Sequence, residues 1–511
     1  MVGGDSAVVV AGSGKGGAGD EPAGASVAVL GLAPNRLPIK IAAKIVHGDA
    51  LTTDWAQLLP PTANTLVFGN PPFLGDHTRD QNQLALLQSV WGSDKTLSRL
   101  DFVTGWHAKT LSYFRQAAGE WAFVTTNSIV QGDQAARLFS EIFHQGWSIK
   151  FAHRTFAWTS EAANAAAVHC VIIGFTKRKV KPRLFTYSTL RGEPHEIPVK
   201  QINAYLVDGP NVLVHKRTTP LSPEMPEVEK GSMPTDGGYL VVTPEQYPTV
   251  AADAIAAKYL RPYIGSRELL NGQKRWCLWL VDLDPADVRR SPLLAYRIEQ
   301  VRQFRQASTA ASTRSYPHHH LFRQFGRTQT GPFLGIPEVS SENRRWLPVA
   351  YLDADVIVSN KVYAAPDDGG LLFAVVSSSM FITWMKTVGG RMKSDLSFSS
   401  TITWNNFPIP PLTDTARAGI IRGGQRVIEA RAQHADRSLA SHYHPLAMDP
   451  TLVNPHLDID RHLDRAFGLT GTPTEIERQT ALLNAYTQQT SGLTFKEPRT
   501  RTPRGSKTRS A

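Results

Sequence analysis

Between residues 41 and 180 the chain repeats one pattern: a short apolar segment, then glycine or polar residues, then a stretch with helical spacing. The segments IAAKIVHGDAL, NTLVFGNPPF and EWAFVTTNSI have the composition of buried strands, and DFVTGWHAKTLSYF has helical spacing. Buried strands that alternate with helices are typical of α/β domains with a largely parallel sheet. Ligands bind such sheets at the carboxyl ends of the strands, where HGD, NPPF and TTNS fall. The sequence therefore predicts an α/β domain over residues 36–180 with a binding site at these strand ends.

The rest of the chain divides by composition. Residues 181–412 contain many prolines, short strand-like segments and one clear helix near 292–308, which is typical of an α+β domain. Helical patterns then predict a small helical C-terminal domain over residues 413–495. We expect the Gly/Ala-rich residues 1–35 to be a flexible leader and the basic residues 496–511 to be a disordered tail.

The composition excludes several classes of protein. Hydrophobic residues make up 41% of the 511 residues, enough for globular cores, and no apolar run approaches the ~20 residues of a membrane span. Two cysteines, Cys170 and Cys277, cannot build a disulfide scaffold or a four-cysteine zinc site, and they fit a reducing cytoplasm. The adjacent His318, His319 and His320 cannot easily converge on one ion, so we expect no metal site.

The charge favours a polyanionic partner. Lys and Arg outnumber Asp and Glu by 55 to 44, a net charge of +11. Six of these cations and one glutamate lie in residues 496–511. Two interpretations of this tail stay open: it contacts nucleic-acid phosphates, or it only keeps the chain soluble.

The string Asn70-Pro71-Pro72-Phe73 directly follows an apolar strand and carries most of the functional information. The amino group of adenine is a poor nucleophile because its lone pair is delocalised into the ring. The Asn70 amide oxygen and the Pro71 carbonyl can accept both N–H protons and draw electron density onto the nitrogen. The prolines hold these acceptors rigid, and Phe73 offers a face for a planar base. The alternative interpretation is a proline-bent loop after a strand.

At this point the sequence resembles a known family. NPPF is similar to motif IV of class I S-adenosylmethionine-dependent amino-methyltransferases. The longer stretches FGNPPFLG, LDFVTGWHAK, AFVTTNSIVQGDQ, RWCLWL, GRMKSDLSFSS and WNNFPIP resemble MmeI-like type IIL restriction–modification proteins, in collinear order over roughly residues 36–490. The resemblance implies a partial Rossmann-like methyltransferase sheet followed by a target recognition domain. It also implies a site-specific DNA adenine-N6 methyltransferase that uses S-adenosyl-L-methionine, binds double-stranded DNA and serves a bacterial, cytoplasmic restriction or phage-defence system.

The same resemblance implies roles for five further residues. Asp49 is similar to the motif III acid beside the adenine moiety of S-adenosylmethionine; its alternative role is to cap a turn. Phe156, or in its place Trp158, corresponds to the aromatic residue that stacks on the flipped target base; the alternative is a core aromatic. Lys393 and Asp395 match base-reading positions, with a local surface ion pair as the alternative.

The sequence also departs from this family. The family places a glycine loop for the cofactor well upstream of NPPF, whereas only 69 residues precede Asn70 and they do not match it. No nuclease domain is recognisable. We therefore expect an N-terminally shortened member. Three alternatives stay open for the first strand and helix of the methyltransferase fold: they are absent, they are degenerate, or a separate chain supplies them, as a separate chain could also supply the nuclease. Two alternatives remain: a DNA-binding specificity fragment with impaired catalysis, and a methyltransferase for RNA or protein glutamine, which usually lacks so long a domain after the catalytic one.

Overall fold

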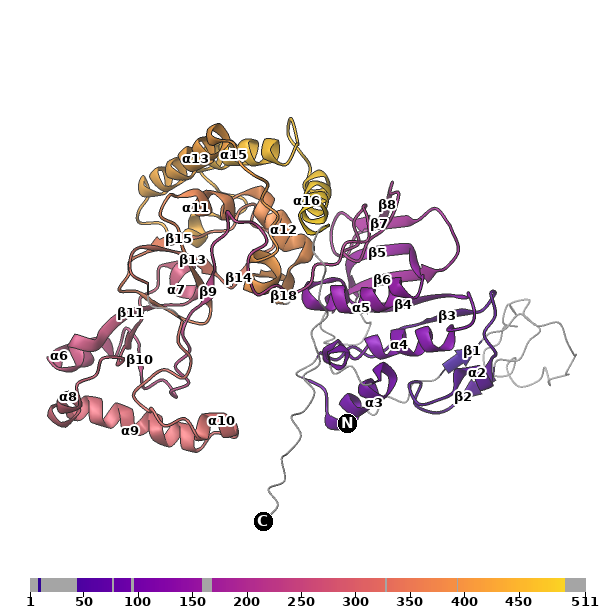
Figure 1. Ribbon diagram of the computed structural model, residues 1–511. Coiled ribbons are helices and arrows are strands. Elements are labelled where there is room, and N and C mark those ends of the chain that lie inside the picture. Colours follow the sequence, from indigo (N-terminus) through magenta and orange to yellow (C-terminus); the bar gives the residue numbers. More distant parts are fainter. Residues whose placement is uncertain are drawn as a thin grey trace, which may run out of the picture.

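A computed structural model describes residues 8–10, 44–75, 78–92, 96–158, 168–326, 329–392 and 394–491. The first sheet and its helices form one half of the molecule, and the second half carries the C-terminal helices along one side (Figure 1). The architecture is mixed α/β, as the sequence predicts.

A six-stranded sheet forms the centre of the first half, with the strand order β3-β4-β6-β5-β7-β8. Its strands are β3 (Leu66–Gly69), β4 (Glu120–Thr126), β5 (Ser148–Trp158), β6 (Val168–Thr176), β7 (Arg183–Tyr187) and β8 (Pro194–Ile197). Strands β3, β4, β5 and β7 run in one direction, and β6 and β8 run in the other. The carboxyl ends of β3, β4 and β5 therefore lie at the same edge of the sheet.

Helices cover one face of this sheet (Figure 1). Helices α4 (Thr104–Tyr113) and α5 (Gly132–His144) pack there, and α3 (Gln81–Trp91) packs against α4. The strand β4 alternates between buried and half-buried residues, so that Trp121 and Phe123 face the helices. On β3 the opposite face is open: the exposed fractions of Leu66 and Phe68 are 61% and 79%.

Two parts of the first half differ from the expected arrangement. The segment before HGD does not join the sheet: β2 (Lys44–Val46) pairs antiparallel with β1 (Val8–Val10), which lies inside the expected leader. Strand β2 has only three residues, and its Lys44 and Ile45 are exposed, so it has no buried face to anchor it in the sheet. The sheet also continues beyond residue 180 through β7 and β8. Strand β8 begins with a proline, which weakens the strand signal in the sequence. An edge strand tolerates proline because the missing N–H is not needed for pairing.

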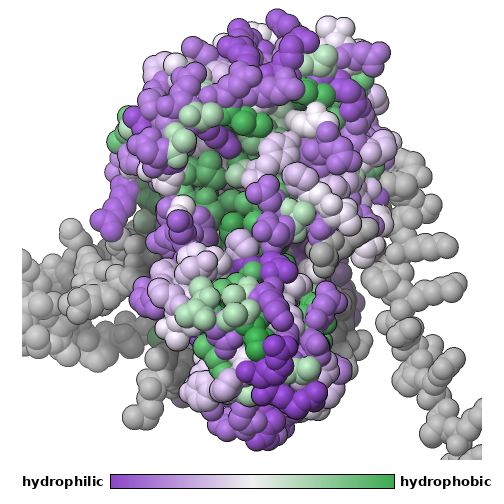
Figure 2. All heavy atoms as spheres, turned by 90° about the vertical axis from the view of Figure 1, so that its left-hand side faces the viewer, coloured by the Kyte–Doolittle hydropathy of each residue, from purple (hydrophilic) through white to green (hydrophobic). Residues whose placement is uncertain are grey.

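The second half begins with three small sheets. Their orders are β10-β12-β11-β16, β15-β13-β17-β9 and β14-β19-β18. The strands are β9 (Glu229–Lys230), β10 (Val241–Val242), β11 (Leu260–Ile264), β12 (Trp276–Leu278), β13 (Phe333–Pro337), β14 (Val339–Ser340), β15 (Ala350–Leu352), β16 (Ile357–Val358), β17 (Val362–Pro366), β18 (Gly390–Met392) and β19 (Asp395–Ser397). Hydrophilic side chains surround a hydrophobic area on the outer face of this half (Figure 2).

Helices join these sheets. They are α6 (Tyr247–Ala252), α7 (Ser266–Asn271), α8 (Pro285–Arg290), α9 (Pro292–Gln306), α10 (Ala311–Arg314), α11 (Leu371–Val376) and α12 (Ser379–Val388). Helix α9 confirms the helix predicted near residues 292–308. It is fixed by the buried Arg305, whose guanidinium donates to the carbonyl oxygens of Pro234, Thr235, His318 and Leu321.

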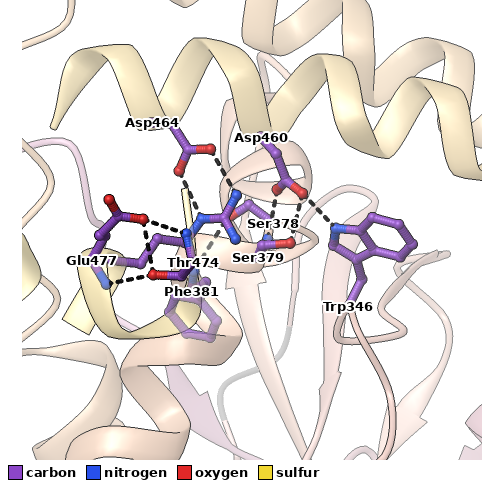
Figure 3. Close-up of polar contacts among 9 residues, drawn as sticks. Trp346, Ser378, Ser379, Phe381, Asp460, Asp464, Thr474 and Glu477 are labelled. Carbon is purple, nitrogen blue, oxygen red and sulfur yellow. Dashed lines mark hydrogen bonds and ion pairs between the residues drawn. The ribbon is translucent and has the colours of Figure 1, made fainter. Parts of the chain in front are cut away.

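The C-terminal region is helical, as predicted, with α13 (Asp414–Ala432), α14 (Leu439–His442), α15 (Pro450–Ala466) and α16 (Glu475–Thr490). Its apolar residues share one core with the β13 sheet and with α11 and α12. Polar contacts add to this packing (Figure 3). The buried Asp460 accepts hydrogen bonds from Trp346 Nε1 (3.0 Å) and from Ser379 N (2.7 Å) and Oγ (2.6 Å). In the part of the chain that the structure describes, no helix is long and apolar enough to cross a membrane.

Candidate active site

Three of the expected functional segments lie along the same edge of the sheet, where β3, β4 and β5 end. Asn70 directly follows β3, and Asn127 directly follows β4. Phe156 and Trp158 are among the last three residues of β5. Because these strands run parallel, the topology brings together segments that are nearly 90 residues apart.

The Asn70–Phe73 loop is anchored at alternate positions. Asn70 and Pro72 are exposed, Pro71 is buried, and Phe73 is half-buried and packs against the core of the first half. The two prolines restrict the φ angles between these anchors. The loop thus presents the Asn70 side chain to solvent from a backbone with little conformational freedom.

The end of this loop is bound to the start of α4. The Leu74 carbonyl accepts a hydrogen bond from Phe102 N (3.0 Å), and Leu74 N donates to Asp101 Oδ1 (3.2 Å). Sequence reasoning missed Asp101. The only signal was an aspartate before the helical stretch FVTGWHAK, a pattern that also fits an ordinary helix start.

Asp49 caps a turn, which is the alternative role considered for it. Its Oδ1 accepts from Leu51 N (2.8 Å), and its carbonyl oxygen accepts from Thr53 N (2.9 Å). The carboxylate is nevertheless exposed. Helix α4 holds this turn through Lys109 Nζ, which donates to the Leu51 carbonyl (3.0 Å). Burial lowers the pKa of Lys109, although nearby Asp54 and Asp49 favour its charged form. Both the Asp49 turn and the Asn70–Phe73 loop are therefore fixed to α4.

The two candidate stacking residues differ in their surroundings. Phe156 is half-buried and stacks on Tyr187 with a centroid distance of 5.3 Å. Trp158 is 39% exposed, and its ring centroid lies 6.2 Å from that of Phe156. One face of the Phe156 ring therefore packs against Tyr187, as in a core aromatic residue, although the side chain is only half-buried. Trp158 has more surface open to a ligand.

Of the two candidate base-reading residues, Asp395 lies at a hairpin. Lys393 is outside the described residues. Asp395 is half-buried and pairs with Met392 across β18 and β19, so the chain reverses direction between them. Asp395 therefore lies directly after the reversal of the chain, at the start of β19. Arg391 fixes the hairpin through an ion pair with Glu342 (2.7 Å).

Two sequence signals for other chemistry can also be placed. Cys170 and Cys277 are both buried free thiols on separate strands, and burial raises the pKa of Cys170 to about 11. Over the described ranges, no group of three or more His, Cys, Asp or Glu side chains is arranged to hold a metal ion.

Comparison with known proteins places the whole chain in one family. Residues 25–186 match the MmeI DNA-methyltransferase domain, residues 208–411 match the MmeI target recognition domain, and residues 412–494 match the MmeI C-terminal domain. The chain is 33% identical to DNA methyltransferase A of Bacillus subtilis (strain 168) over 464 residues, which is 89% of this chain and 51% of that protein.

A solved structure agrees with this assignment. The type IIL restriction-modification enzyme MmeI in complex with DNA superimposes with a TM-score of 0.81 and 37% identity, covering 87% of this chain and 60% of MmeI. The chain thus spans between half and two thirds of the length of these relatives. With all three domain types present in order over residues 25–186, 208–411 and 412–494, the chain belongs to the MmeI family.

Proposed function

We propose that this chain transfers a methyl group from S-adenosylmethionine to N6 of adenine in duplex DNA, as the modification part of a restriction-modification system. The observation that carries the proposal is the position of Asn70-Pro71-Pro72-Phe73. The loop follows β3 at the edge where β4 and β5 also end, within a chain of the MmeI family.

The chemistry requires two acceptors at one nitrogen. The Asn70 amide oxygen and the Pro71 carbonyl oxygen accept hydrogen bonds from the two N6–H groups, which localises the lone pair on N6. S-adenosylmethionine supplies an electrophilic methyl group. With the donor bound, N6 would displace the methyl group from sulfur, so that the carbon–sulfur bond breaks as the carbon–nitrogen bond forms and S-adenosylhomocysteine leaves. The Asn70 and Pro71 oxygens would stabilise the positive charge that develops on N6 until N6 loses one proton to water. Phe73 packs on the base plane.

The methyl donor and the target base need further contacts. Asp49 fits one of these roles, because its carboxylate is exposed at a turn that α4 holds in place. It would lie beside the adenine moiety of the bound donor. The target base has to leave the duplex to reach Asn70. Phe156 or Trp158 would then replace the lost base stacking, and the hairpin with Lys393 and Asp395 would read the neighbouring sequence.

We propose that a second polypeptide completes the methyltransferase sheet. Strand β3 pairs with β4 on one side, and no described strand pairs with its other side. The face beside this edge exposes 61% of Leu66 and 79% of Phe68, an unusual state for strand residues. In affinity purification from the native host, the wild-type chain should retain this partner and Phe68→Asp should lose it. A complex that survives Phe68→Asp would place the partner elsewhere.

The central test is Asn70→Ala, with Asn64→Ala as its control in the exposed turn before β3. Tritium transfer from labelled S-adenosylmethionine to unmethylated phage DNA should fall about 100-fold or more in Asn70→Ala. Duplex affinity should stay near wild type, since it depends mainly on phosphate and groove contacts. Near-wild-type transfer by Asn70→Ala would refute the assignment. A wild-type chain that binds DNA and never the methyl donor would instead be a specificity fragment.

A further inference from the structure

We propose that Asp101 is a positioning residue of the active site, whose carboxylate clamps the end of the Asn70–Phe73 loop to the end of β4. The inference rests on the proposed function of that loop. Asp101 lies three residues before α4 and is only 5% exposed. It acts through the loop rather than on the DNA or the methyl donor.

The carboxylate joins three segments that are distant in sequence. Its Oδ1 accepts from Leu74 N and from Val103 N, each at 3.2 Å. Its Oδ2 lies 3.2 Å from the Thr126 hydroxyl and 3.4 Å from the Ser128 hydroxyl and accepts from this hydroxyl pair. One side chain thus ties the loop after β3 to the start of α4 and to the end of β4.

These contacts complete a clamp on both ends of the catalytic loop. At the first end, Gly69 pairs with Phe123 in the sheet. At the second end, Leu74 is held by Asp101 and by the backbone of Phe102 (3.0 Å). Between the two ends stand two prolines, which leave few free dihedral angles. The acceptor oxygens proposed for the adenine amino group therefore have a fixed direction.

The clamp also fixes the neighbouring strand end. The hydroxyl oxygens of Thr126 and Ser128 lie 2.7 Å apart, so one hydroxyl donates to the other and the proton that remains is directed to Asp101 Oδ2. Asn127 stands between them, directly after β4. The distance between the two strand ends that frame the site therefore depends on Asp101. Errors of about 1 Å in such positions can reduce a rate about 100-fold.

An ordinary helix-start turn does not explain this arrangement. Such a turn needs only the bond from Val103 N to Oδ1. Burying a carboxylate is unfavourable unless several donors compensate it. Here the hydroxyl pair at the end of β4 supplies one further donor, and Leu74 N, at the end of the Asn70–Phe73 loop, supplies another. The donors point to a role in holding the loop.

Hydrogen–deuterium exchange tests the clamp without requiring catalysis. In the full chain, Asp101→Ala should accelerate exchange in the peptide covering residues 69–75 at least tenfold, because Leu74 N loses its acceptor. Asp101→Asn keeps an acceptor oxygen and should stay within about threefold of wild type. The control is Asp80→Ala, which removes a similar cap from α3, where Asp80 accepts from Gln83 N (2.8 Å). Unchanged exchange in Asp101→Ala, or equal acceleration in the control, would overturn the inference.

Methyl transfer to unmethylated phage DNA supplies the second readout. Asp101→Ala should lower kcat about 10- to 100-fold and leave the Kd for DNA within threefold, and Asp101→Asn should recover most of the rate. An unchanged kcat in Asp101→Ala would refute the positioning role. If the wild-type chain transfers no methyl group while the exchange effect is present, the proposed function fails and the clamp stands.

A third variant covers the case in which Asp101→Ala does not fold. Thr126→Val removes one donor at the end of β4 and keeps the shape of the side chain. It should accelerate exchange in residues 69–75 by a smaller factor than the loss of the whole carboxylate, and in the same direction. Exchange at wild-type rates in this variant would mean that β4 does not hold the loop through Asp101.

Discussion

His107 in α4 is fully buried among the rings of Trp121, Phe123 and Phe175, with centroid distances of 5.0, 5.2 and 6.1 Å. Neither of its ring nitrogens has a hydrogen-bond partner. An unsatisfied buried polar group lowers stability by about 1–3 kcal/mol. We therefore expect His107→Leu, which is close in volume, to raise the melting temperature of the methyltransferase core. A lower melting temperature would mean that the aromatic contacts of the imidazole outweigh its desolvation.

The same residue predicts a pH dependence. Burial lowers the pKa of His107 from 6.5 to about 3, so the unfolded chain binds a proton between these values and the folded chain does not. Protonation of this group therefore does not affect stability well above pH 6.5, and the folded state progressively loses stability as the pH drops from 6.5 toward 3. Between pH 7 and pH 5 the loss is about 2 kcal/mol. In thermal unfolding at both values, His107→Leu should lose less stability than wild type. Identical losses would assign the pH effect to other groups.

At the scale of secondary structure, one carboxylate fixes α15 to the start of α12. Removing Asp460 leaves the donors of Trp346 and Ser379 without an acceptor in a buried environment. Asp460→Ala should therefore lower stability by about 2–4 kcal/mol. The control is Asp458→Ala on the same helix, where the partly exposed pairs with Arg426 and Arg461 contribute less than about 1 kcal/mol. Equal shifts of the unfolding transition in both variants would contradict this prediction.

The β18–β19 hairpin is the element that we expect to read sequence. A lysine suits the guanine acceptors and an aspartate suits the cytosine amino group of one G·C pair. Exchanging the charges, with Lys393→Asp and Asp395→Lys, should change the preferred base at one G·C position and keep the methylated adenine. Methylome sequencing of expressing cells measures both. The matched control exchanges the exposed pair Arg183 and Glu196, between β7 and β8, and should keep the motif. An unchanged motif in the hairpin variant would indicate a simple surface ion pair.

At the scale of the whole molecule, the net charge of +11 includes the six cations of residues 496–511, which lie outside the described residues. Ending the chain at Gly492 should weaken binding to all duplexes by a similar factor. It should also reduce the salt dependence of binding, since each lost phosphate contact lowers the slope by about 0.9. Sequence preference should not change. Titrations of duplex DNA with the full and the shortened chain at several salt concentrations measure both effects. An unchanged salt dependence of the affinity would mean that the tail only keeps the chain soluble.

The sequence by itself determined the features that depend on local pattern. Short apolar segments predicted the strands before Asn70 and Asn127. Helical spacing predicted α4, α9 and the C-terminal helices, and long collinear motifs predicted the family. These predictions succeed because periodicity reports which face of an element is buried. The same information also located the candidate loop, since strand ends are visible as a change from apolar to polar residues.

Only the tertiary structure decided how these elements pair and which side chains meet. Pattern alone placed Asp49 at the end of a sheet strand, whereas β2 pairs with β1 outside the sheet. It gave no indication of the hairpin in which Met392 pairs with Asp395. Its signal for Asp101 fitted an ordinary helix start, because the donors that define its role come from Leu74 and Thr126, 27 and 25 residues away. Strand partners and buried hydrogen bonds depend on long-range contacts, and a local pattern of hydrophobicity does not encode them.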